Sequence, residues 1–182
     1  MIGREEILRQ LRKVHLIITA ETELQVYAAG GCIRDEHFGL PVKDVDLIVP
    51  VGCTDEKVAF SVMERFARSY HAMFDEPVAI TMAYNQSASC RETLGDFDAR
   101  LYGVVKLQSP LCEVDVLFSR YGSIAEVLSH FDCNLNTGYM NTLGFVDYAE
   151  PLELVWMKPV SPSRELRMLN KWAQIQEVRD AY

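Results

Sequence analysis

The segment from residue 25 to residue 49 constrains the fold of this chain more than any other. Residues 25–29 are a short apolar stretch that predicts a strand, and Gly30-Gly31 stops it. Residues 32–38 then predict a short helix, and residues 44–49 predict a second strand. A strand, a glycine turn, a helix and another strand therefore follow one another directly.

The second of these strands carries an acidic pair. Because side chains alternate between the two faces of a strand, Asp44 and Asp46 point the same way, with about 6.6 Å between their α-carbons. A divalent cation bound between them would neutralise their repulsion, although an edge strand with a solvated acidic face shows the same pattern. A later strand over residues 111–118 places Glu113 and Asp115 on one face and offers the third carboxylate of a two-metal site.

The glycine pair favours a phosphate ligand. Glycines that follow a strand and precede a helix expose backbone N–H groups, and the positive end of the helix dipole suits a triphosphate. Gly30 and Gly31 would then hold phosphate beside a metal on Asp44 and Asp46. This segment therefore predicts a nucleotide site next to a metal site.

The rest of the chain mixes helices and strands. Alternating and helical spacing of apolar residues predicts the following elements: a helix over 4–18, a helix that opens at the N-cap Thr54, a strand over 78–84, a polar loop over 85–100, a hairpin of strands 101–107 and 111–118, a helix over 124–130, a small hairpin over 138–147, and a terminal helix over 163–179 capped by Ser161 or Ser163.

Composition and charge limit the class of protein. With 182 residues, 49% of them hydrophobic and 24% charged, the chain has the size and composition of one compact globular domain. Its 18 Lys and Arg against 26 Asp and Glu give a net charge of −8. This charge disfavours the sequence-independent electrostatic binding to phosphate backbones that non-specific nucleic-acid binders use. There is no apolar run long enough for a signal peptide or a membrane span. The five scattered cysteines indicate reduced thiols. We therefore expect a cytoplasmic protein without membrane contact.

The glycine and acid motifs together resemble a known family. The residues that match its pattern G-G-x-x-R-D, L-G and D-x-D, with only the leucine changed, are Gly30, Gly31, Arg34, Asp35, Phe38, Gly39, Asp44 and Asp46. The pattern is that of the head domain of poly(A) polymerases and tRNA nucleotidyltransferases (CCA-adding enzymes), within the DNA polymerase β-like nucleotidyltransferase superfamily. The family's third acid is followed five residues later by arginine, a spacing that Asp115 and Arg120 reproduce and that Glu113 fits less well.

Two later motifs of the family are only partly kept. Residues 130–137 are similar to R-R-D-F-T-I-N-A, with Asp132 and Asn136 kept and both arginines replaced. The base-reading motif E-D-x-x-R falls on residues 160–164, where Arg164 survives and Arg167 follows one turn later. The similarity thus spans roughly residues 25–170 and weakens towards the end.

This resemblance implies a fold and an activity. The fold is α+β, the nucleotidyltransferase fold: a mixed central β-sheet flanked by helices, with a head domain over residues 1–160 and a short neck-like C-terminal helix over 161–182. The activity is metal-dependent transfer of a nucleoside monophosphate from a nucleoside triphosphate (NTP) to an acceptor hydroxyl, with release of pyrophosphate. Asp44, Asp46 and Asp115 would be the catalytic residues and hold two Mg²⁺ ions, or Mn²⁺. The nucleotide-binding residues would be Gly30, Gly31, Arg34, Asp35, Asp132, Asn136, Arg164 and Arg167.

The acceptor and the activity each have an alternative. The family implies an RNA 3′ end, whereas the negative charge and the small size favour a protein hydroxyl, a small molecule, or a protein partner that supplies the acceptor-binding surface. The eroded later motifs are also consistent with a non-catalytic nucleotide-binding module that retains the fold.

Overall fold

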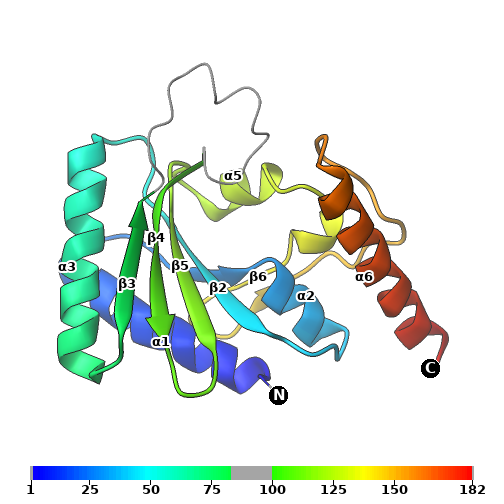
Figure 1. Ribbon diagram of the computed structural model, residues 1–182, viewed down its shortest axis with the longest axis horizontal. Coiled ribbons are helices and arrows are strands. Elements are labelled where there is room, and N and C mark those ends of the chain that lie inside the picture. The colour runs from blue at the N-terminus through cyan, green and yellow to red at the C-terminus, as the bar shows by residue number, and fades with distance from the viewer. Residues whose placement is uncertain (1, 83–99, 182) are drawn as a thin grey trace.

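The computed structural model describes residues 2–82 and 100–181 and contains one mixed β-sheet. Its strand order is β3-β4-β5-β2-β1-β6-β7, and β2 and β5 pair in parallel while the other neighbouring strands are antiparallel (Figure 1). The strands are β1 Tyr27–Ala29, β2 Asp44–Pro50, β3 Val78–Met82, β4 Leu101–Gln108, β5 Glu113–Ser119, β6 Tyr139–Met140 and β7 Val146–Asp147. The helices are α1 Arg4–Glu21, α2 Gly31–His37, α3 Glu56–Phe74, α5 Ile124–Ser129 and α6 Pro162–Asp180, with a 3₁₀ turn η2 at Asn134–Asn136.

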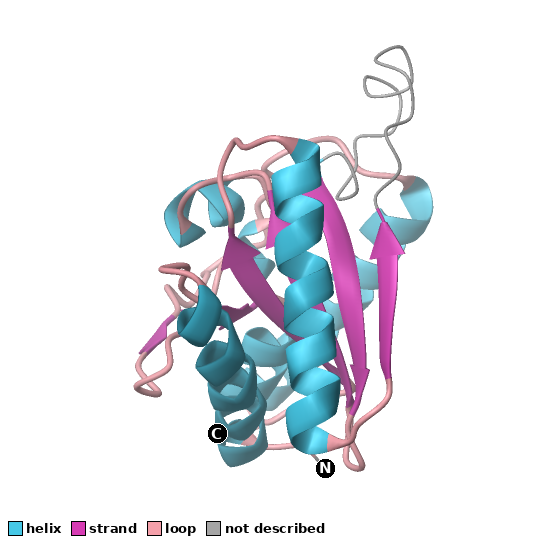
Figure 2. Cartoon of the chain, turned by 90° about the vertical axis from the view of Figure 1, so that its left-hand side faces the viewer, coloured by secondary structure: helices cyan, strands magenta, loops and turns pink. Residues whose placement is uncertain are grey.

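Helices α1 and α3 cover one face of the sheet. Both are amphipathic, and their apolar sides pack on alternate residues of β2 and β5. Figure 2 shows a long helix lying in front of the strands. This main core includes Leu11, Val14, Met63, Phe66, Val45, Leu47, Val49, Val114, Val116 and Phe118. Burial of these residues fixes which side chains of β2 and β5 face the other way.

Among the described residues, α5 covers the opposite face of the sheet over its second half. Ile48 and Leu117, near the ends of β2 and β5, pack against Val127 and Leu128 of α5 and against Phe131. The residues that precede them on this face are the acidic ones at the start of the two strands. The uncovered half is therefore polar.

Helix α6 packs beside α2 and η2 through a third apolar cluster. Met168 and Ile175 of α6 are buried with Phe38, Cys133 and Leu135. Ser161 is the N-cap of α6 and its hydroxyl accepts a hydrogen bond from the Arg164 N–H, so the predicted helix and one of its two expected caps are confirmed.

The predicted α+β class and the mixed sheet with flanking helices are confirmed, and one local prediction is wrong. The N-cap of α3 is Asp55, whose carboxylate accepts from the Lys57 N–H at 2.8 Å, whereas the Thr54 N–H is engaged by the Tyr102 hydroxyl. Most of the polar loop expected over 85–100 lies outside the described residues. No helix in the described part of the chain combines the length and apolar character needed to cross a membrane.

Candidate active site

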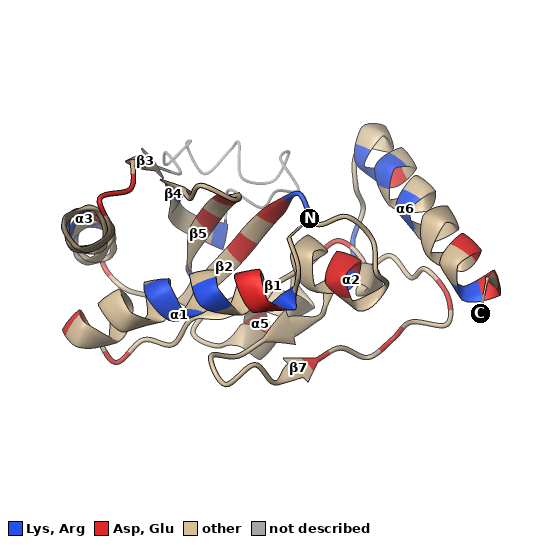
Figure 3. Cartoon of the chain, turned by 90° about the horizontal axis from the view of Figure 1, so that it is seen from below, with Lys and Arg blue, Asp and Glu red and all other residues tan. Residues whose placement is uncertain are grey.

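The acidic residues of β2 and β5 lie side by side on the uncovered face of the sheet. In the parallel ladder Asp46 is directly opposite Asp115, and Asp44 is opposite Glu113. Neighbouring strands run about 4.8 Å apart, so the paired carboxylates project from adjacent positions. Seen from below, the acidic bands of the two strands adjoin (Figure 3). We call Asp44, Asp46, Glu113 and Asp115 the acidic face.

The predicted acids are close enough to act on one another. Burial, followed by the charges of Asp44 and Asp115, raises the pKa of Asp46 to about 7. The charges of Arg164 and Lys106 act in the opposite direction. The electrostatic environment of Asp46 therefore disfavours a third negative charge and favours a bound cation.

Lys106 on β4 lies against this acidic face. It is the register partner of Asp115, and its Nζ lies 3.3 Å from Asp115 Oδ2. Sequence analysis did not single it out, because an exposed lysine at an alternate strand position is an ordinary surface feature until the strand pairing is known. The pairing of β4 with β5 makes it a neighbour of the site.

The glycine turn lies against the same strand. Gly30 is the N-cap of α2 with a φ of +80°, a left-handed conformation that favours glycine. Two residues further, the Cys32 thiol contacts the carbonyl oxygens of Ala29 at 3.4 Å and Asp46 at 4.0 Å. Burial, and then the nearby charge of Asp46, raises the pKa of Cys32 to about 12. The start of α2 is therefore adjacent to the acidic strand.

The two glycines differ in what they leave open. The Gly30 N–H donates to the Gly138 carbonyl at 3.1 Å and is thus used within the protein. A β-carbon added to Gly31 would meet only the Arg34 guanidinium, at 3.5 Å, which is an ordinary contact. Packing among the described residues does not require glycine at position 31, so the space beside it is available to a ligand.

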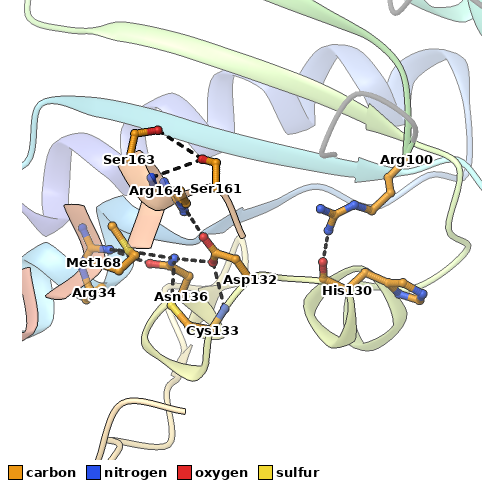
Figure 4. Close-up of polar contacts among 10 residues, drawn as sticks. All are labelled: Arg34, Arg100, His130, Asp132, Cys133, Asn136, Ser161, Ser163, Arg164 and Met168. Atoms are coloured by element: carbon orange, nitrogen blue, oxygen red, sulfur yellow. Dashed lines mark hydrogen bonds and ion pairs between the residues drawn. The ribbon is translucent and has the colours of Figure 1, made fainter. Parts of the chain in front are cut away.

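Five of the predicted nucleotide-binding residues form one internal polar network, and Figure 4 shows all of them except Asp35. Arg34 donates from Nε to Asp35 at 2.8 Å and from Nη1 to the Asn136 carbonyl oxygen at 2.5 Å. The Asn136 amide donates to Asp132 at 2.9 Å, and Arg164 Nε donates to the other Asp132 oxygen. The network links α2, the segment around η2, and α6.

Burial and charge pairing are balanced inside this network. Arg34, Asp35, Asp132 and Asn136 are each less than one tenth exposed. Burial alone would raise the pKa of Asp132, but hydrogen bonds from Arg164 and Asn136 outweigh it and hold that pKa below its usual value. The four residues therefore act as an internal scaffold in this structure.

Two predicted residues on α6 are more accessible. Arg164 is partly exposed; it contacts Asp132 of the polar network, and its charge lowers the pKa of Asp46 on the acidic face. Arg167 is exposed on the same helix. Lys171, which the sequence analysis missed, approaches Asp35 at 3.4 Å from α6.

The donor set of the acidic face fits a hard divalent cation. Carboxylate oxygens are the ligands that Mg²⁺ and Mn²⁺ prefer, and Asp46 and Asp115 are in adjacent register. Over residues 2–82 and 100–181, no three His, Cys, Asp or Glu side chains converge into a ready metal-binding group.

Comparison with known proteins finds similarity in three dimensions. No protein-family model matches the chain, and no curated protein matches its sequence. A solved tRNA-processing enzyme, apo form 2, superposes with a TM-score of 0.59 and 21% identity, over 90% of this chain and 43% of that one. Apo form I of a tRNA-processing enzyme has a TM-score of 0.49 and 22% identity, over 83% of this chain and 32% of that one. The Thermotoga maritima CCA-adding enzyme complexed with tRNA has a TM-score of 0.47 and 17% identity, over 76% of this chain and 29% of that one.

The superposition with apo form 2 of the tRNA-processing enzyme shows a shared fold. The chain spans less than half the length of each of these enzymes. At this identity, the superposition with the tRNA-processing enzyme shows that the two share an architecture over most of the present chain. The mixed α+β fold predicted from the sequence is thus shared with a solved tRNA-processing enzyme.

Proposed function

We propose that this chain is a metal-dependent nucleotidyltransferase that moves a nucleoside monophosphate from an NTP to an acceptor hydroxyl and releases pyrophosphate. The observation that carries the proposal is the register of β2 and β5, in which Asp46 is opposite Asp115 on the half of the sheet face that α5 does not cover. The start of α2, with its glycine turn, contacts the same strand. The fold shared with a tRNA-processing enzyme supports this class of activity.

In this proposal Asp44, Asp46 and Asp115 hold two Mg²⁺ ions, or Mn²⁺. When bound, such ions supply Lewis-acid stabilisation of the charge that develops on the transferring phosphoryl group and its leaving group. The raised pKa of Asp46 supports the assignment, because two flanking carboxylates need a cation to stay ionised together. The Asp115 carboxylate also serves as the proton acceptor for the attacking hydroxyl.

The chain's other residues bind and position the nucleotide. Gly31 leaves space for the triphosphate beside the acidic strand. Arg164 supplies positive charge near Asp46, and Arg167 extends the same helix surface. The network of Arg34, Asp35, Asp132 and Asn136 contributes indirectly, because together with Arg164 it holds α2, η2 and α6 against one another.

For the acceptor we propose an RNA 3′ end, because the solved structure with the same fold is named a tRNA-processing enzyme. The net charge of −8 makes this contact local or dependent on a protein partner. In this arrangement residues 1–160 are the catalytic head and residues 161–182 a neck-like helix.

Incubation with each radiolabelled NTP, total RNA and Mg²⁺ tests the proposal. We expect label to appear in RNA, and Asp44→Ala, Asp46→Ala and Asp115→Ala each to abolish the transfer while circular dichroism shows an intact fold. Glu153→Gln, which removes an exposed carboxylate elsewhere, is the control. Calorimetric binding of NTP without transfer to RNA, protein or small molecules would instead identify a non-catalytic nucleotide-binding module.

A further inference from the structure

Lys106 faces the acidic residues because of its strand position. Its neighbours Val105 and Leu107 are buried in the main core, so Lys106 projects to the opposite side of β4. Its side chain is 53% exposed and that of Asp115 is 31% exposed, with 3.3 Å between Nζ and Oδ2. The ammonium thus lies at the solvent edge of the acidic face.

The charges around this ammonium are mostly negative. Strand β5 contributes Asp115 and Glu113, and β2 contributes Asp46 and Asp44 in the paired positions. On β4 the next residue of the same face is the uncharged Gln108, and on β3 the register partner of Lys106 is Ala79. Lys106 therefore reduces by one unit the negative charge that a divalent cation would meet.

We propose that Lys106 is the resident counter-ion of the acidic face, pairing with Asp115 in the absence of a divalent cation and weakening the binding of that cation. The inference rests on the proposed function, since it assigns the cation to Asp46 and Asp115. It makes Lys106 a positioning residue that sets the concentration of metal at which the site fills.

Lys106 has two opposing effects on cation affinity, and their sizes decide whether removal of its charge strengthens or weakens cation binding. An exposed ion pair contributes little to holding a carboxylate in place, so loss of that positioning weakens metal binding only slightly. A divalent ion on Asp115 would lie within about 5 Å of the ammonium. Repulsion between a single and a double charge at that distance in water corresponds to about a tenfold change in affinity. Repulsion dominates, and removal of the lysine charge strengthens cation binding.

The test is titration of the full chain with Mn²⁺ in the absence of nucleotide, with free Mn²⁺ followed by electron paramagnetic resonance. The variants are Lys106→Met, which keeps the length of the side chain, and Lys106→Arg, which keeps its charge. Lys57→Met is the matched control, because Lys57 is exposed on α3 beyond the far end of β2. Thermal unfolding in a chelator checks that each variant folds.

We expect Lys106→Met to bind Mn²⁺ about tenfold more tightly at low ionic strength, with a smaller gain at high salt because screening removes the repulsion. Lys106→Arg and Lys57→Met should bind as the wild type does, and adding Asp115→Asn to Lys106→Met should abolish the gain. If the wild type binds Mn²⁺ and Lys106→Met binds it equally well or more weakly, this inference is overturned and the proposed metal site is not. Absence of Mn²⁺ binding in the wild type and in Lys106→Met would overturn the proposed metal site as well.

Discussion

Substituting Asp46 by asparagine should stabilise the metal-free protein. The pKa of this carboxyl is raised from 3.8 to about 7, first by burial and then by the charges of Asp44 and Asp115. Each pKa unit is worth about 1.4 kcal/mol, so ionised Asp46 costs the folded state up to about 4 kcal/mol at high pH. The neutral amide keeps the shape but must itself be solvated or hydrogen-bonded, which leaves a net gain of about 1 to 3 kcal/mol.

The sign of the pH dependence follows from the direction of the shift. A carboxyl whose pKa is raised by folding destabilises the folded state once the pH exceeds its pKa in the unfolded chain, 3.8. The resulting loss of stability is complete above about pH 7. Asp46→Asn should therefore be more stable than the wild type at pH 8 and nearly equal to it at pH 4.

Thermal unfolding with a chelator and with Mg²⁺ measures both parts of this prediction. At pH 8 in chelator we expect the Tm of Asp46→Asn to be roughly 2 to 12 °C higher than that of the wild type. Mg²⁺ should raise the Tm of the wild type and have little effect on the variant, since the ion stabilises only the form that binds it. A variant that is less stable than the wild type at pH 8 in chelator would refute the electrostatic reasoning.

Three further predictions concern residues assigned to nucleotide binding and the choice of nucleotide. Gly31→Val should weaken NTP binding in calorimetry at least tenfold without lowering the Tm by more than a few degrees, because position 31 has room for a β-carbon but a side chain there would obstruct the phosphate. Arg164→Gln should cost about 1 to 3 kcal/mol in urea unfolding at pH 7 by leaving Asp132 with one partner fewer. Since the pKa of Asp132 is lowered by folding, that cost should shrink as pH falls below about 4. Because only Arg164 of the base-reading motif is kept, the four NTPs should differ by less than about a hundredfold in kcat/KM. Ser161→Asp, which can still cap α6, should increase the preference for one NTP. A thousandfold preference in the wild type would contradict this prediction.

The local part of the site could be predicted from the sequence. Alternation on a strand is a property of the backbone, so Asp44 and Asp46 were expected on one face and lie on one face. The glycine turn before α2 was predicted for a similar reason, since a left-handed residue such as Gly30 marks the start of that helix. Both signals depend on residues that are close together in the chain.

The pairing of distant strands could not be predicted in the same way. Nothing local in the sequence specifies that β5 lies parallel to β2 with Asp115 opposite Asp46, or that β4 brings Lys106 to Asp115. Helix capping shows the same limit on a smaller scale, because the Tyr102 hydroxyl from β4 engages Thr54 and leaves Asp55 to cap α3. In each case a residue from another element decided the outcome.

The position of the motif residues in the fold determines what their substitution can reveal. Arg34 is buried, and its guanidinium is bonded to Asp35 and Asn136, so a variant at any of these positions disturbs the attachment of α2 and α6 before it affects a ligand. Loss of activity in such a variant would not separate nucleotide binding from folding. Gly31 and Lys106 lie where the fold tolerates change, so a change in NTP or metal affinity at these positions reports on the ligand itself. The function of the site is therefore best tested at its less buried residues, although half of the residues that match its glycine and acid motifs are buried.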